Sequence, residues 1–70
     1  MASYYVNKKA QSNGDHEVHT STCSFIPKPE NREYLGVFNH CSGAVAEAKT
    51  RHPFWHINGC YFCSNECHTS

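Results

Sequence analysis

The sequence predicts an α+β domain in which a small antiparallel sheet of about three strands packs against one helix. Two observations predict this fold: short β-prone segments separated by turn residues in the first half of the chain, and one helical apolar pattern in the second half. At 70 residues the chain has room for one core only, so we expect a single domain over residues 1–70.

Residues 3–8 and 15–20 are expected to form a β-hairpin. Both segments contain β-prone residues, and Asn13-Gly14 between them is a strong turn signal. Two prolines within residues 26–31 exclude a helix and a central strand there. Residues 33–38, which are rich in aromatic and branched side chains, are then expected to form the third strand.

A helix is expected from about residue 40 to residue 51. Apolar side chains recur there at i, i+3, i+4 and i+7 and form one stripe, which consists of Cys41, Ala44, Val45 and Ala48. Asn39 is a suitable N-cap, because its side chain accepts a hydrogen bond from the first turn. His52-Pro53 ends the helix, since proline disfavours helical geometry in the preceding residue.

Two pairs of residues with metal-binding side chains carry the strongest functional signal. His19-x3-Cys23 lies where the second strand leads into a loop, and Cys60-x2-Cys63 follows the turn residues Asn58-Gly59. Together they supply one imidazole and three sulfurs, the usual ligands of a tetrahedral Zn²⁺ site. The 36 residues between Cys23 and Cys60 are enough chain to fold back and close it. The sequence therefore predicts a zinc clip between the second strand and the C-terminal segment.

Cys67 is an alternative to His19 as the fourth ligand. It follows Cys60 by seven residues and Cys63 by four, so the three sulfurs would share one face if residues 60–68 were helical. The C-x2-C pair also occurs in thioredoxin-like redox motifs, but those belong to a βαβ context that this sequence does not show. Cys41, on the apolar stripe, is interpreted as a packing residue. The remaining histidines without a paired ligand are interpreted as surface or packing residues: His16, His40, His52 and His56.

The composition argues against several classes of protein. Six basic and six acidic residues give a formal net charge of zero, and the basic residues are scattered, unlike the concentrated basic surface of a nucleic-acid-binding protein. No segment approaches the roughly 18 apolar residues of a membrane span, and the first residues do not form a secretory signal. We therefore expect a cytoplasmic protein with no membrane association. Its five cysteines are expected to be reduced, since an odd number fits a complete disulfide framework poorly.

The order of these features resembles the zinc-binding N-terminal domain of the bacterial Ada DNA-repair methyltransferases and related small modules of nucleases. That family has a ligand pair spaced x3, a short strand ending in Phe, a capped Ala-rich helix and a closing C-x2-C. The corresponding parts of this chain lie within residues 17–63: His19 and Cys23, residues 31–38, residues 44–48, and Cys60 and Cys63. The resemblance implies a zinc-stapled fold and raises nucleic-acid binding as one function.

Two departures from the family argue against its activity. In the Ada domain the first ligand is a cysteine whose thiolate accepts a methyl group from a DNA phosphotriester, whereas this chain has His19 there. A neutral imidazole is not the activated thiolate that such chemistry uses. The family's closing segment is basic, whereas residues 60–67 contain no Lys or Arg.

We therefore expect a zinc-stabilised binding or adaptor module without catalysis, whose partner is a protein. Closed four-ligand sites are usually structural. Four aromatic residues near the site would form a docking patch or part of the core: Phe54, Trp55, Tyr61 and Phe62. One alternative is a thiol-based redox sensor or methyl acceptor that uses Cys41 or Cys67 beside the zinc. A second is an Ada-like nucleic-acid-binding module, which neutral charge disfavours.

Overall fold

The computed structural model describes residues 1–69. Their secondary structure comprises strands, one α-helix and two short 3₁₀ turns, in the order β1 (Ala2–Asn7), β2 (Asp15–Thr20), η1 (Pro29–Asn31), β3 (Arg32–Phe38), α1 (Cys41–Arg51), β4 (His56–Gly59) and η2 (Asn65–Cys67). No helix in the described part of the chain is long and apolar enough to cross a membrane.

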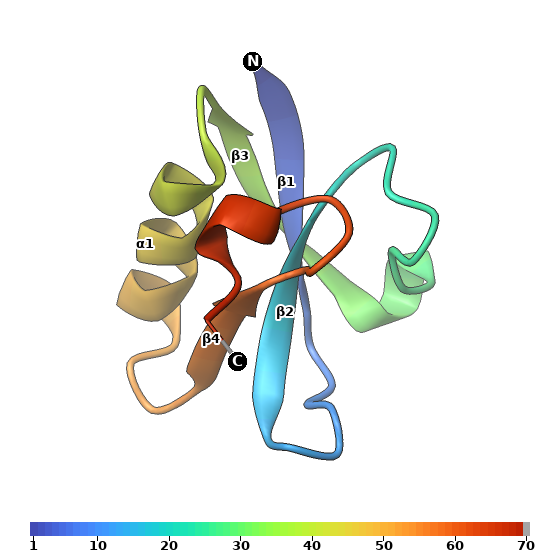
Figure 1. Cartoon of the computed structure of the whole chain (residues 1–70). Coiled ribbons are helices and arrows are strands. Elements are labelled where there is room, and N and C mark those ends of the chain that lie inside the picture. Colours follow the sequence, from blue (N-terminus) through green and yellow to red (C-terminus); the bar gives the residue numbers. More distant parts are fainter. Residues whose placement is uncertain (70) are drawn as a thin grey trace.

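The strands form one mixed sheet with the order β3-β1-β2-β4, and α1 packs against all four strands (Figure 1). β1 pairs antiparallel with β2 and with β3, whereas β4 pairs parallel with β2. The α+β class and the single helix are confirmed. The sheet has four strands rather than three and is not purely antiparallel. The added strand is only four residues long and ends in Asn58-Gly59, which is a turn signal in most sequences.

The helix has its expected extent but a different N-cap. His40, not Asn39, occupies the cap position, and its Nδ1 accepts from the backbone N–H of Ser42 at 3.1 Å. The predicted stripe faces the sheet: Cys41, Ala44 and Ala48 are buried and Val45 is partly buried. These small side chains let α1 lie close to the sheet, where Val6 and Val18 are completely buried.

Trp55, between α1 and β4, is held between two imidazoles. The rings of His52 and His16 stack on it with centroids 3.6 and 3.8 Å away. His52 Nε2 also lies 2.8 Å from Oε1 of Glu33 in β3, and Nε2 is the donor because a carboxylate only accepts. Arg51 donates to the same carboxylate at 3.1 Å. These contacts tie the C-terminal end of α1 to the edge strand β3 and, through Trp55, to the interior strand β2.

This network makes stability depend on pH through Glu33. Burial raises the pKa of Glu33, but hydrogen bonds from His52 and Arg51 outweigh it, so the pKa lies below its usual range. Glu33→Gln is expected to lower the free energy of unfolding at about pH 7 by roughly 1 kcal/mol. Because the folded pKa is depressed, this difference is present above the ordinary carboxyl pKa and is lost as the pH falls through the folded value.

Urea unfolding at about pH 7 and about pH 3 measures the effect. The exposed Glu30→Gln is the matched control and is expected to change neither value. An equal loss from Glu33→Gln at both pH values would show that the charge of this carboxylate does not stabilise the fold.

Candidate metal centre

The parallel pairing of β2 and β4 brings the first ligand of each predicted pair together. Val18 lies opposite Gly59 in the register, and the N–H of Cys60 donates to the carbonyl of Val18 at 3.0 Å. The residues that follow this register pair are His19 and Cys60. Both are almost fully buried, with 2 % and 1 % of their surface exposed. His19 and Cys60, which are 41 positions apart in the sequence, thus become neighbours because the two strand ends lie side by side.

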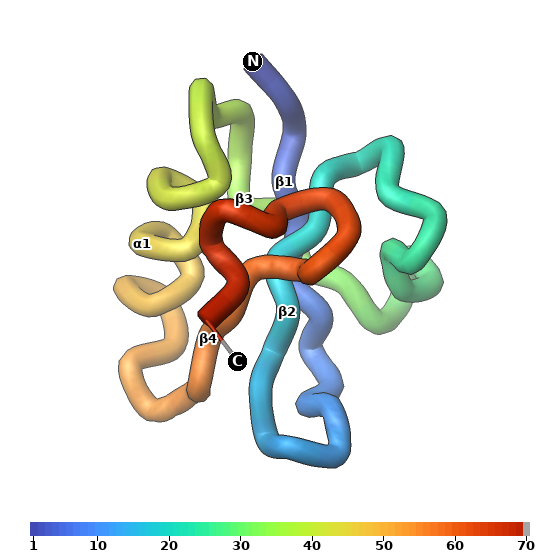
Figure 2. Tube along the Cα trace, viewed as in Figure 1, coloured from blue at the N-terminus to red at the C-terminus, as the bar shows by residue number. Residues whose placement is uncertain are grey.

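A tight turn after β2 and another after β4 bring the second residue of each predicted pair, Cys23 and Cys63, close to His19 and Cys60. The N–H of Cys23 donates to the carbonyl of Thr20 at 3.2 Å, which reverses the chain after β2. After β4, the N–H of Ser64 donates to the carbonyl of Cys60 at 2.8 Å and closes the turn that contains Cys63. Figure 2 shows the segment after β4 (orange to red) running between α1 and the loop after β2.

The four side chains form a compact cluster with the dimensions of a tetrahedral metal site. One donor atom from each of His19, Cys23, Cys60 and Cys63 lies within 4.8 Å of all the others. The sulfurs of Cys23 and Cys60 are 3.9 Å apart, as are Sγ of Cys63 and Nδ1 of His19. Zinc bond lengths imply edges of about 3.8 Å between two sulfurs and about 3.6 Å between sulfur and nitrogen. The donor atoms therefore already stand near ligand spacing, and the cluster can bind a metal ion.

The electrostatics of the cluster favour a cation. Burial lowers the pKa of His19, so its imidazole is neutral and keeps a lone pair for a metal. Burial raises the pKa of Cys60, and burial together with a hydrogen bond to Cys63 raises that of Cys23 to about 12. Burial also acts to raise the pKa of Cys63, but hydrogen bonds from Cys23 and the Thr20 N–H outweigh it and lower the pKa. Without a metal, these shifts favour the thiolate at Cys63 over that at Cys23 or Cys60, and a bound cation would favour the thiolate at all three.

Two further groups orient the cluster from outside. The backbone N–H of Thr20 donates to Sγ of Cys63 at 3.4 Å. Oε1 of Glu17, two residues before His19 on the same face of β2, lies 3.8 Å from Nε2 of His19. Nδ1 thus faces the sulfurs while Nε2 lies near a carboxylate, beyond hydrogen-bond distance, and this charge favours the proton on Nε2 and leaves the lone pair on Nδ1.

Cys67, the alternative ligand, lies elsewhere. It forms a disulfide with Cys41, with an S–S distance of 1.96 Å and a Cα–Cα distance of 6.2 Å. Residues 60–68 form a turn followed by the short 3₁₀ turn η2 and not an α-helix. The sulfurs of Cys60, Cys63 and Cys67 therefore do not lie on one helix face. The expectation that all five cysteines are reduced is wrong for this pair. Cys41 is buried in the core as predicted, and sequence spacing gave no sign of its bond.

An exposed group of aromatic rings, which we call the aromatic patch, borders the cluster. It consists of Phe25, Tyr61 and Phe62, which are 58 %, 57 % and 67 % exposed. Phe25 and Phe62 stack with centroids 4.4 Å apart, and Tyr61 meets Phe62 edge-on at 5.3 Å. Phe25 was missed from the sequence, although it follows Cys23 by two residues. Phe54 is 94 % exposed but is not among these stacked rings, and Trp55 is held by histidines.

Comparison of the chain with models of known protein families, with curated proteins and with solved structures finds no significant match. The resemblance to the Ada domain is thereby neither supported nor contradicted and stays a prediction.

The end of β4 tolerates no side chain at Gly59. A Cβ there would lie 2.7 Å from both the carbonyl oxygen of Ser64 and Cβ of Cys67, closer than such atoms approach. Gly59→Ala is therefore expected to push the end of β4 and the segment of Ser64 and η2 apart and to lower the free energy of unfolding by about 1–3 kcal/mol. Urea unfolding of the purified chain measures this loss.

Ser12→Ala, in the exposed β1–β2 turn, serves as the control and is expected to change stability by less than about 0.5 kcal/mol. Wild-type stability of Gly59→Ala would mean that the backbone after β4 is free to move away from η2.

Proposed function

We propose that this protein is a small binding module without catalysis, whose fold is stabilised by one Zn²⁺ ion held by His19, Cys23, Cys60 and Cys63. The observation that carries the proposal is the convergence of four donor atoms, from two distant segments, within 4.8 Å of one another. No other grouping in the described residues combines four ligands of these types.

The chemistry of the donor set favours zinc and a structural role. Three sulfurs and one imidazole suit a borderline-soft ion of tetrahedral preference. All four positions are filled by protein, which leaves no open position for water or a substrate. Single cores of this size rarely supply more than about 3–5 kcal/mol, whereas a structural zinc contributes roughly 10–16 kcal/mol in small peptides. The zinc clip would therefore be the largest single stabilising contribution.

The aromatic patch supports a protein partner. Phe25 and Phe62 hold each other in an exposed stack, and aromatic side chains of this kind are enriched at protein interfaces. The patch lies on the two turns that the clip would fix, so zinc would order the surface that binds. Neutral net charge disfavours a nucleic-acid partner, whose affinity depends on basic side chains.

A thiol-based redox sensor is the second candidate, and the Cys41–Cys67 disulfide is the observation that favours it. Disulfides persist in oxidising compartments and are usually transient or redox-sensing in the cytosol. If the protein is cytoplasmic, as its sequence predicts, this bond would be a reversible one.

The clip is tested by counting bound zinc in native mass spectra of ligand variants. Wild type is expected to bind one Zn²⁺, whereas His19→Ala, Cys23→Ser, Cys60→Ser and Cys63→Ser are expected to bind it at least about tenfold more weakly and to show reduced occupancy, because each removes one of the four ligands. The double variant Cys41→Ser/Cys67→Ser is the control for cysteine removal outside the cluster and is expected to keep one zinc. Cobalt substitution should give the intense absorption of tetrahedral thiolate coordination in wild type and control only.

Full zinc occupancy in His19→Ala would overturn the ligand set. Absence of zinc from wild type that is purified without chelator and then dialysed against Zn²⁺ would overturn the clip itself.

The aromatic patch is tested by photo-crosslinking in cells. A p-benzoylphenylalanine in place of Phe62 is expected to crosslink to a protein, because position 62 is at the centre of the patch. The same group in place of the exposed Phe54, outside the patch, is the control and is expected to give no such product. Crosslinks from position 62 to nucleic acid alone would contradict a protein partner and favour the Ada-like alternative.

A further inference from the structure

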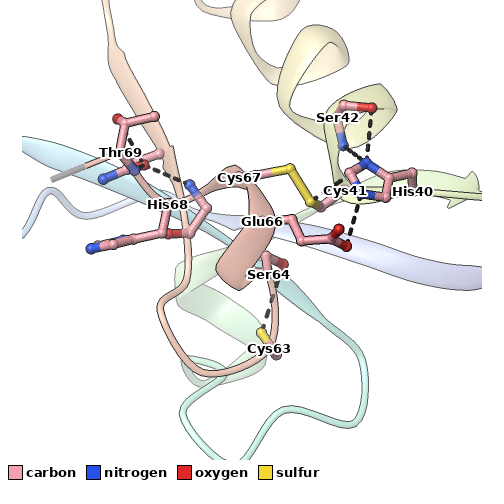
Figure 3. The surroundings of a disulfide bond; sticks show 11 residues. His40, Cys41, Ser42, Cys63, Ser64, Glu66, Cys67, His68 and Thr69 are labelled. Atoms are coloured by element: carbon pink, nitrogen blue, oxygen red, sulfur yellow. Dashed lines mark hydrogen bonds and ion pairs between the residues drawn. A yellow bond between two sulfur atoms is a disulfide. The ribbon is translucent and has the colours of Figure 1, made fainter.

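A second group of metal-binding side chains lies between the N-terminus of α1 and η2. One donor atom from each of His40, Cys41 and Cys67 lies within 4.8 Å of the other two. Figure 3 shows the sulfur of Cys67 reaching Cys41, with His40 and Glu66 beside the bond. We propose that reduction of the Cys41–Cys67 disulfide converts this group into a second metal site, for Zn²⁺ or a similar thiophilic divalent cation. The proposal shares no residue with the zinc clip and does not rest on it.

The second group repeats the arrangement around His19. Nδ1 of His40 lies 3.8 Å from Sγ of Cys41, and Nε2 lies 3.1 Å from Oε1 of Glu66. In the first cluster the corresponding distances are 3.9 Å from Nδ1 of His19 to a cysteine sulfur and 3.8 Å from Nε2 to Glu17. In both places one ring nitrogen lies near sulfur and the other lies near a carboxylate, and at His40 the carboxylate is within hydrogen-bond distance and orients the imidazole.

The backbone that carries the second group is held independently of the disulfide. The N–H of Cys67 donates to the carbonyl of Ser64 at 2.9 Å, and Nδ1 of His68 lies 3.0 Å from the carbonyl of Gly59. Cys41 is anchored at the start of α1 and is 4 % exposed. After reduction, the two sulfurs need only separate to the roughly 3.8 Å of a tetrahedral zinc site. That is close to the 3.9 Å between the sulfurs of Cys23 and Cys60.

Metal at Nδ1 of His40 replaces the hydrogen bonds that this atom makes to Ser42. The loss of these hydrogen bonds is offset by the two metal–thiolate bonds at Cys41 and Cys67, whose negative charges attract the cation.

Unlike the zinc clip, the second site has a free coordination position. Three protein ligands leave a fourth position, which a water molecule or a small ligand fills. The group opens to a groove of about 370 Å³ that His40, Cys41, Asn65 and Glu66 line together with Cys63. A reductant and a metal ion therefore have a route to the disulfide at Cys41 and to His40, and the bound metal would be exchangeable.

The redox step balances with an external thiol as the reductant. Two molecules of a small thiol supply two electrons and two protons, the Cys41–Cys67 bond breaks, and the external thiols leave as their disulfide. Metal binding then releases the two protons from the Cys41 and Cys67 thiols.

The number of zinc ions bound in each redox state tests the proposal. The oxidised chain and a phosphine-reduced chain are dialysed against equal Zn²⁺, and native mass spectrometry counts the bound ions. Reduction is expected to add one zinc per chain, and thiol alkylation of a parallel sample confirms that the disulfide is open. An unchanged count in the reduced chain overturns the proposal. Because the change between the two states is measured, the proposal is tested even if the clip binds no zinc.

Three variants separate the second site from other effects. His40→Ala is expected to weaken binding of the additional zinc at least tenfold, and Cys41→Ser/Cys67→Ser is expected to abolish the gain on reduction. His56→Ala, at an exposed histidine outside both groups, is expected to behave as wild type. Equal gains in His40→Ala and wild type would exclude His40. If reduction unfolds the chain, Zn²⁺ is expected to restore the circular dichroism spectrum of wild type but not of His40→Ala, and failure to do so overturns the site.

Discussion

The parallel pairing of β2 with β4 decides where the functional side chains lie, because His19 and Cys60 follow the register pair Val18 and Gly59. A shift of this register by one residue would turn His19 to the opposite face and separate it from the sulfurs. The pairing itself is short. β4 has four residues, and the core behind it is made largely of valine and alanine. A metal bound at the ends of both strands would therefore fix the register that creates its own site.

Gly59 connects this pairing to the C-terminal segment. The space that a Cβ would take at Gly59 is occupied by Cys67 and by the carbonyl of Ser64, and its carbonyl lies 3.0 Å from His68. The end of β4 thus contacts both cysteine groups. Cys60, the residue after Gly59, belongs to the first cluster, and Cys67, which packs against Gly59, belongs to the disulfide. The packing at one glycine places the two groups side by side, although they use different ligands.

Local patterns made the helix, the hairpin and the third strand predictable. The spacing of Cys41, Ala44 and Ala48 and the Asn13-Gly14 turn are signals within short windows. The close ligand pairs His19-x3-Cys23 and Cys60-x2-Cys63 are equally local, and it was possible to infer that they meet because one metal needs four donors. β4 was missed since its parallel partner lies far away in sequence and its last two residues are usual in turns. The Cys41–Cys67 bond spans 26 residues, a separation that spacing rules do not address.

The odd number of cysteines is explained by their distribution between the cluster and the disulfide. Three cysteines with one histidine complete a four-ligand cluster, and the remaining two pair with each other. The number of cysteines alone did not indicate this distribution, because His19 fills the position in the cluster that a sixth cysteine would otherwise take. The distribution also has a chemical consequence. The sulfurs of Cys23 and Cys60 are 3.9 Å apart, and a metal that coordinates both thiolates would withhold their electron pairs from oxidation. Without a metal at the first cluster, the sulfurs of Cys23 and Cys60 are close enough to form a second disulfide when an oxidant is present. Metal occupancy of the first cluster would thus keep these thiols from oxidation, and the two groups would remain chemically distinct because one is closed by a metal and the other by a disulfide.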